Sequence, residues 1–164
     1  MRTHLHVDLR QQACNIEDVA PHEVVRAGRH YIAKTLLERG TASVEPLSPE
    51  NPLIFSVGPL AGTNFSNANR LSIGCRSPLT GGIKESNSGG TFGFAMGQLE
   101  LAGFTLNDAS EDWVVIEITK NKEVRYHKAD DYLGKNNFEV ANMLHERFGK
   151  KISLAICGPV GEYM

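Results

Sequence analysis

The chain opens with a regular alternation of apolar and polar residues over Thr3–Leu9. A period of two is typical of a half-buried β-strand. The apolar positions are Leu5, Val7 and Leu9, and the polar positions between them are His4, His6 and Asp8. Imidazole and carboxylate groups on one face are able to ligate a metal ion, but so near a chain terminus a solvated polar face is the stronger interpretation.

Apolar residues recur at helical spacing between Asp18 and Gly40, which predicts a helix over this range. The apolar seam consists of Val25, Ile32 and Leu36, and Pro21 suits the first turn. Asp18 is suited to cap the helix and Gly40 to end it. Gly28 weakens the helix by about 1 kcal/mol relative to alanine, which leaves room for a break. The basic side chains fit a solvated face at least as well as a site; they are Arg26, Arg29 and His30.

Shorter segments predict further strands and helices. Strands are expected at 53–57, 71–75, 113–118, 123–127 and 150–157, the third and fourth forming a hairpin. Turns or loops are expected at 46–52, 77–82 and 86–90. Helices are expected at 91–103, where Gly103 ends the helix and Gly93 and Gly97 allow close packing, and at 136–148. The buried stripe of the second helix is expected to be Phe138, Ala141, Leu144 and Phe148.

Composition limits the class of protein. The 164 residues suit one domain, and an apolar content of 41% is ordinary for a globular protein. The net charge of −2 argues against nucleic-acid binding, and no apolar run reaches membrane-spanning length. Because the N-terminus lacks the apolar segment of a signal peptide, we expect a cytoplasmic location. The cysteines form no Cys-x-x-Cys motif, so no zinc site or cluster is expected within the chain; they are Cys14, Cys75 and Cys157.

Residues 53–107 differ from the rest of the chain. Ten of the 16 glycines lie there, and the stretch has few charged side chains: Arg70, Arg76, Lys84, Glu85 and Glu100. Glycine lets backbone N–H groups approach an anion closely, and few carboxylates are present to repel it. The pattern favours a surface for a large phosphate-bearing cofactor. A generic nucleotide site is the weakest alternative, because neither a Gly-x-x-x-x-Gly-Lys-Ser/Thr motif nor a Gly-x-Gly-x-x-Gly motif after a strand occurs.

Several motifs resemble one family in residue type, order and spacing. They are residues 46–51, 58–63, Arg70, 77–82, 87–90, 102–104, 133–135 and 158–162. Together they resemble the N-terminal domain of the aldehyde:ferredoxin oxidoreductase family. The resemblance implies an α+β fold, a two-part and mostly β base with mixed sheets and a few helices. Residues 1–164 would then form a single domain that corresponds to an incomplete N-terminal domain of the family.

The resemblance also implies a cofactor and an activity. Family members carry a tungstopterin, a bis-molybdopterin with tungsten or molybdenum, whose phosphates share a magnesium ion. A 4Fe-4S cluster lies beside one pterin, and its cysteines belong to a part of the enzyme that follows residue 164. The enzymes oxidise aldehydes to carboxylic acids and pass electrons to ferredoxin.

Five positions match family positions that meet the cofactor. Arg70 matches an arginine that contacts the pterin, and the Asn87 backbone carbonyl matches a magnesium ligand. Ser88, Gly89 and Gly90 match backbone that passes close under the cofactor. Arg76 is supporting charge only. No catalytic residue is assigned, because His30, His127 and His145 are candidates by residue type alone and have no visible partner.

The chain departs from the family in one residue and in length. His30 stands where the family usually has glycine, and family enzymes are several times longer. Two functions remain open: a subunit or fragment of an oxidoreductase, inactive alone, or a truncated non-catalytic domain acting as an interaction module. Expected partners are the remaining domains or a separate subunit, ferredoxin through the whole enzyme, and a second copy in a homodimer. Nucleic acid and membrane are not expected partners.

Overall fold

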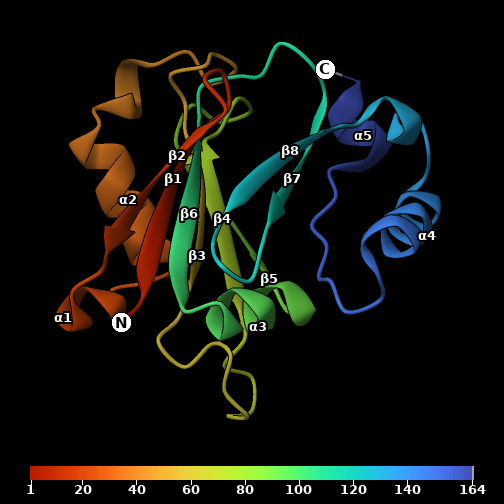
Figure 1. Ribbon diagram of the computed structural model, residues 1–164. Helices are drawn as coiled ribbons and strands as arrows, with labels where there is room; N and C mark the ends of the chain where they lie inside the picture. The colour runs from red at the N-terminus through yellow and green to blue at the C-terminus, as the bar shows by residue number, and fades with distance from the viewer. Residues whose placement is uncertain (164) are drawn as a thin grey trace.

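The computed structural model describes residues 1–163 and has an α+β fold built on a six-stranded mixed sheet (Figure 1). The strand order is β2-β1-β6-β3-β4-β5, in which β1 and β6 run parallel and all other neighbours run antiparallel. The strands are β1 (Thr3–Asp8), β2 (Ala13–Asp18), β3 (Leu53–Val57), β4 (Leu71–Arg76), β5 (Ile83–Ser88) and β6 (Leu101–Asn107). A separate hairpin pairs β7 (Val114–Ile118) with β8 (Val124–Lys128). The α+β architecture expected from the sequence is confirmed.

Two separate cores lie on opposite faces of the main sheet, because neighbouring residues of a strand point to opposite sides. Ile54 packs with Ile32 and Leu36 of α2 on one face. Phe55 packs with Met96 of α3 on the other, where the hairpin also packs. Figure 1 shows α2 and the hairpin on opposite sides of the sheet. The helices are α1 (Pro21–Val24), α2 (Arg29–Glu38), α3 (Thr91–Gln98), α4 (Asn137–Phe148) and α5 (Gly158–Glu162), with 3₁₀ turns at Thr41–Ser43 and Asp130–Tyr132.

The N-terminal strand is confirmed, but its polar face is not fully solvated as expected. His4 is 1% exposed, and its Nε2 atom lies 2.8 Å from the Thr105 hydroxyl. Gly103 pairs with His4 across the β1–β6 ladder, and a Cβ at Gly103 would lie 3.1 Å from the imidazole ring. The missing side chain therefore makes room for the ring. His6, two residues on, remains partly exposed and pairs with Glu17 at 2.8 Å.

The single helix predicted over 18–40 is instead two helices, α1 and α2; Pro21 lies in the first turn of α1 as expected. Asp18 does not cap a helix; it pairs with Thr3 at the end of β2, an edge strand that the sequence analysis missed. The chain breaks at Gly28, whose φ of +64° is unfavourable for residues with a side chain, and α2 begins immediately afterwards. The break that Gly28 allowed is therefore what the chain adopts.

Two further element boundaries differ from the prediction within the glycine-rich stretch. The loop expected at 86–90 is mostly the last part of β5, an exposed edge strand. The helix that starts at Thr91 ends at Gln98, after which Glu100 takes a φ of +56°. Gly103 therefore does not end a helix but lies within β6, which pairs with strands on both sides and is buried over its first five residues. Central burial overrides the helical spacing that the sequence suggested.

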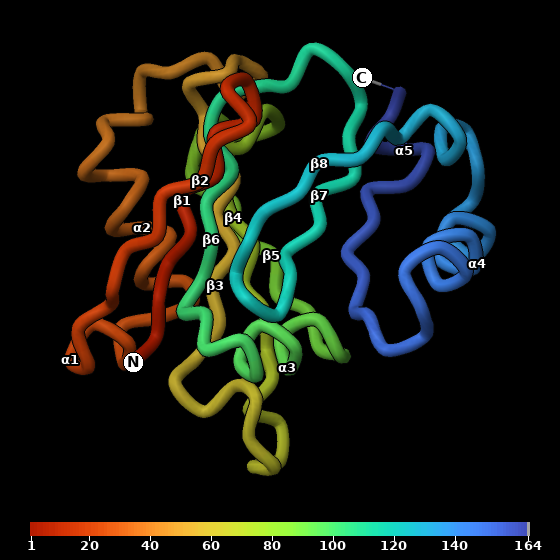
Figure 2. Tube along the Cα trace, in the orientation of Figure 1, coloured from red at the N-terminus to blue at the C-terminus, as the bar shows by residue number. Residues whose placement is uncertain are grey.

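The residues after the hairpin form a second layer beside it (Figure 1). Helix α4 is confirmed, and its start is fixed by Asn136, which makes a reciprocal capping box with Glu139. Its buried residues are Val140 and Leu144, whereas Phe138, expected in the buried stripe, is 84% exposed. The strand expected at 150–157 is absent; this segment is extended but unpaired and runs between the hairpin and α4 (Figure 2). Within residues 1–163, no helix has the length and apolar character to cross a membrane.

Candidate cofactor-binding surface

The structure brings Arg70 and residues 87–90 together on one exposed surface. Arg70 directly precedes β4, and the β4–β5 ladder pairs the next residue, Leu71, with Ser88. The Arg70 Nε–H group donates a hydrogen bond to the Asn87 side-chain oxygen at 2.5 Å. The other end of the guanidinium lies beside the backbone of Gly89, because a Cβ built there would be 3.7 Å from Arg70 Nη1.

Arg70 carries a positive charge with no acidic partner. Among residues 1–163, no carboxylate lies within 4.0 Å of its guanidinium nitrogens. Arg70 is exposed, and only its Nε makes a hydrogen bond to the described part of the chain, so its two terminal NH₂ groups are unpaired there. A guanidinium whose terminal NH₂ groups are unpaired is suited to bind a phosphate or carboxylate through two parallel hydrogen bonds.

The two glycines beside Arg70 have different physical reasons to be glycine. Gly90 has a φ of +106°, which residues with a side chain rarely adopt. Gly89 has an ordinary backbone conformation, and a Cβ there would meet nothing in the chain closer than the 3.7 Å contact with Arg70. The fold therefore does not require glycine at position 89. A ligand that approaches the backbone there would require it, so this part of the chain fits the cofactor that the resemblance implies.

The start of α3 adds further donors to the same surface. Gly90 occupies the position before the helix, and no side chain caps the helix start. The first N–H groups of a helix have no intrahelical partner and carry partial positive charge. An anion held at Arg70 and Gly89 would lie near these groups.

Close backbone packing holds Arg70 in place. A Cβ on Gly93 would lie 2.6 Å from the Asn69 carbonyl oxygen, so α3 lies directly against the residue before Arg70. A Cβ on Gly97 would lie 2.1 Å from the carbonyl carbon of Ala61. The expectation that this glycine pair permits close packing is confirmed.

Arg2 ties the loop that follows β3 to the sheet, a role that the sequence analysis missed. Its guanidinium donates to four backbone carbonyls: Gly58 at 3.0 Å, Pro59 at 3.0 Å, Ala61 at 2.6 Å and Leu101 at 3.1 Å. The next residue of the loop, Gly62, donates its N–H to the Asn69 side chain at 2.8 Å. The loop fixed by Arg2 is therefore bonded to the residue that precedes Arg70.

A second arginine reaches the same surface from α2. Arg29, the first residue of α2, lies 3.4 Å from Glu85 of β5. The other carboxylate oxygen of Glu85 lies 3.4 Å from the Asn87 amide nitrogen, which also donates to the Ser72 hydroxyl at 3.2 Å. A hydrogen bond with Ser72, then the Asn87 amide and the Arg29 charge, lower the pKa of Glu85 below its usual value. One of the few carboxylates in residues 53–107 is thus placed beside the surface, which the sequence did not predict.

Arg76 lies at the other end of β4 from Arg70. Its guanidinium donates to the backbone carbonyls of Val44 and Gly81, so it braces two turns. We therefore do not include Arg76 in the cofactor-binding surface.

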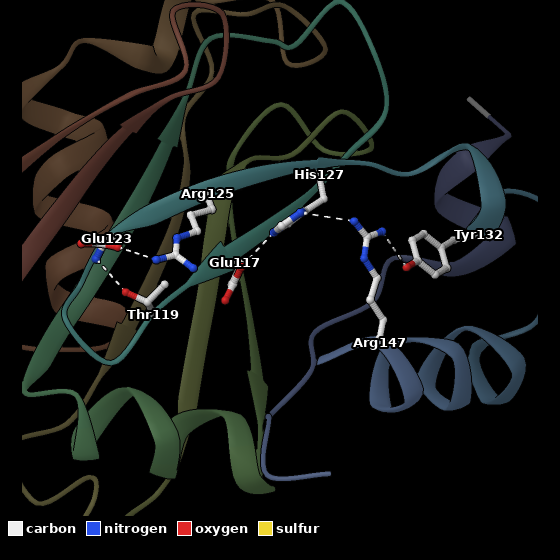
Figure 3. Close-up of polar contacts among 7 residues, drawn as sticks. All are labelled: Glu117, Thr119, Glu123, Arg125, His127, Tyr132 and Arg147. Carbon is white, nitrogen blue, oxygen red and sulfur yellow. Dashed lines mark hydrogen bonds and ion pairs between the residues drawn. The ribbon is translucent and has the colours of Figure 1, made fainter. Parts of the chain in front are cut away.

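His127 has partners that the sequence did not reveal (Figure 3). Its Nε2 lies 2.8 Å from Glu117 across the hairpin, and Arg147 of α4 donates to its Nδ1 at 3.4 Å. Arg147 also donates to the Tyr132 hydroxyl at 3.2 Å. This network joins the hairpin to α4 and is structural. Within the described chain, no three His, Cys, Asp or Glu side chains gather to hold a metal ion.

An open groove of about 740 Å³ lies between α3, β7, α4 and the segment 151–154. Its lining is mainly apolar and includes Phe92, Met96, Ile118, Leu144 and Phe148. Neither Arg70 nor Asn87 lines this groove. The groove and the candidate cofactor-binding surface are therefore different features.

Residues 4–164 match the family model described as "Aldehyde ferredoxin oxidoreductase, N-terminal domain". The chain belongs to the aldehyde ferredoxin oxidoreductase family. It is 37% identical over 130 residues to a tungsten-containing aldehyde ferredoxin oxidoreductase of Pyrococcus horikoshii, covering 77% of this chain and 21% of that protein. It is 35% identical over 79 residues to the glyceraldehyde-3-phosphate:ferredoxin oxidoreductase of Pyrococcus furiosus, covering 48% of this chain and 10% of that protein.

A solved structure shares the fold of this family member. It is the BamBC active site complex of benzoyl coenzyme A reductase with 1,5-dienoyl-CoA, with a TM-score of 0.84 and 28% identity. The match covers 91% of this chain and 23% of that chain. This chain spans about one fifth of the length of the curated aldehyde ferredoxin oxidoreductases it matches, 21% for the first of them. Both the family resemblance and the fold expected from it are confirmed.

Proposed function

We propose that this chain is the N-terminal cofactor-binding part of a tungsten or molybdenum bis-pterin oxidoreductase that oxidises aldehydes to carboxylic acids with ferredoxin as acceptor. One observation supports this above the others. Arg70, a cation without an acidic partner among residues 1–163, lies beside the Asn87–Gly90 segment at a glycine that the fold itself does not require.

Each residue of the surface has a defined part in the proposal. Arg70 binds a phosphate or pterin oxygen through the two terminal NH₂ groups of its guanidinium. The Asn87 backbone carbonyl is a ligand of the magnesium ion, which prefers oxygen donors. Ser88, Gly89 and Gly90 let the cofactor approach the backbone closely. The metal and pterins, when bound, supply the oxidation–reduction chemistry, and this chain supplies binding and electrostatics.

The rest of the enzyme supplies what this chain lacks. Because the match covers 21% of the first curated relative, we assign the 4Fe-4S cluster, the substrate pocket and the contact with ferredoxin to other domains or a separate subunit. Residues 1–164 then act as one domain, located in the cytoplasm, that is not active alone. A homodimer of the whole enzyme is compatible with this assignment.

A non-catalytic interaction module is the second candidate. The apolar groove of about 740 Å³ favours it, because an uncovered apolar surface tends to acquire a partner. This candidate predicts association without metal or pterin.

Co-purification tests the two candidates. The chain is produced with the polypeptide that carries the remaining domains, and tungsten, molybdenum and pterin are measured in the complex. Metal and pterin in the wild-type complex, reduced in Arg70→Gln but not in Arg10→Gln, support the enzyme. Arg10 is a suitable control because it is an exposed arginine with a 3.1 Å contact to Asp108, outside the surface. A metal-free complex, or self-association of the chain alone, would support the module instead.

A further inference from the structure

Two arginines from distant parts of the sequence approach one pair of side chains. Arg70, before β4, donates to the Asn87 side chain at 2.5 Å, and Arg29, at the start of α2, contacts Glu85 at 3.4 Å. Asn87 and Glu85 lie two residues apart on β5 and contact each other at 3.4 Å. The order in space is therefore Arg29, Glu85, Asn87, Arg70, so both guanidinium groups lie near the same short segment of β5.

The backbone of α2 also lies against this segment. A Cβ on Gly28 would lie 3.3 Å from the Ser72 hydroxyl, and Ser72 pairs with Asn87 in the β4–β5 ladder. The Gly28 N–H group donates to the Ser56 hydroxyl at 2.9 Å. The start of α2 is thus fixed to the sheet, and the exposed Arg29 side chain extends from it.

The two members of the Arg29–Glu85 pair are held very differently. The Glu85 side chain is 11% exposed, whereas the Arg29 side chain is 81% exposed. A contact of 3.4 Å is long for a charge-assisted hydrogen bond, which is usually about 2.7–2.9 Å. Because the Arg29 guanidinium is largely exposed to water and the contact is long, the pair contributes little to stability. Arg29 can therefore leave Glu85 for a stronger anion at small cost.

We propose that Arg29 is a second anion-binding residue of the cofactor-binding surface, and that it exchanges Glu85 for a phosphate group of the ligand. The inference rests on the proposed function; the phosphate-bearing ligand is the one already proposed there, and the new element is the exchange at Arg29. Glu85 holds Arg29 near the surface before binding and opposes the ligand by its own negative charge.

The roles of the two residues predict effects of opposite sign. The full chain is titrated with inorganic pyrophosphate, and the amide signals of Gly89 and Gly90 are followed by NMR. Arg29→Gln weakens binding about fivefold, the factor expected for one ion pair at contact distance in water. Arg29→Lys keeps most of the affinity because it keeps the charge. Glu85→Gln strengthens binding by about two- to threefold, because a repulsive charge farther from the ligand is removed.

Arg26→Gln is a matched control for Arg29→Gln. Arg26 lies three residues earlier, is exposed, and contacts Glu23 at the same distance of 3.4 Å, but within residues 1–163 no hydrogen bond or ion pair joins it to β5. It should leave the pyrophosphate affinity unchanged. A structural role for the Arg29–Glu85 pair would weaken binding in both Arg29→Gln and Glu85→Gln.

The outcomes separate this inference from the proposed function. Arg70→Gln weakens binding in every case where the proposed surface is correct. If Arg29→Gln then behaves like Arg26→Gln, or if Glu85→Gln weakens binding, the role proposed for Arg29 is wrong while the proposed surface is supported. If pyrophosphate does not shift the amide signals of Gly89 and Gly90, or if Arg70→Gln does not change the pyrophosphate affinity, the proposed cofactor-binding surface itself is wrong. Weaker binding in Arg29→Gln with stronger binding in Glu85→Gln supports the inference.

Discussion

Replacement of Arg2 by glutamine is the most direct test of how the loop before Arg70 is held. Arg2 donates four hydrogen bonds to backbone carbonyls, three of them partly buried and one exposed. A hydrogen bond of this kind contributes about 1 kcal/mol net, and the exposed one less, because water replaces it. Glutamine retains at most two donors. We expect Arg2→Gln to lower the free energy of unfolding by about 3 kcal/mol, a decrease in Tm of about 6–12 °C for a chain of this size.

The assay is urea denaturation followed by tryptophan fluorescence, with hydrogen exchange at the Gly62 amide as a local readout. Arg10→Gln is the control, since Arg10 is exposed and its guanidinium pairs with the Asp108 side chain at 3.1 Å. It should change the free energy of unfolding by less than about 0.5 kcal/mol. If Arg2→Gln costs less than about 1 kcal/mol, water satisfies the loop carbonyls and the role given to Arg2 is refuted. Unchanged exchange at Gly62 would likewise show that the loop does not depend on Arg2.

Three further predictions concern close packing, pH and the proposed surface. Gly97→Ala places a Cβ 2.1 Å from the Ala61 backbone, and we expect urea denaturation to show a loss of about 2 kcal/mol despite the better helix propensity; Gly82→Ala, whose nearest atom is 3.8 Å away, should change little. Burial, then the charges of neighbouring groups, lower the pKa of His4 to about 3 from 6.5. Only the unfolded chain then gains this proton between pH 6.5 and 3, so the free energy of unfolding falls with falling pH by up to about 1.4 kcal/mol per pH unit in that window. Denaturation of His4→Gln at several pH values should lack this component of the pH dependence. Gly89→Ala should leave the Tm within about 2 °C but weaken pyrophosphate binding by NMR titration; a loss of stability instead would mean that the glycine serves the fold.

Elements with a strong local pattern could be predicted from the sequence. The strand β1, the hairpin and the helix that starts near Asn136 were all confirmed. The edge strands β2 and β5 were missed because their side chains are mostly exposed, so their sequences lack the apolar alternation of a half-buried strand. Gly103 was misread for the opposite reason. It serves a buried central strand, where a side chain would meet His4 and the Phe55 backbone.

The sequence alone determined the family, the α+β class and the residues 70 and 87–90 of the proposed surface, because these depend on residue types at fixed spacing. Only the tertiary structure showed that Arg70 bonds Asn87, that Arg2 holds the loop before Arg70, and that Arg29 and Glu85 reach the same place. Each of these contacts joins residues 17 to 59 positions apart. Their proximity is set by strand register and by where α2 packs on the sheet. Neither the strand register nor the position of α2 can be inferred from the local pattern of apolar and polar residues.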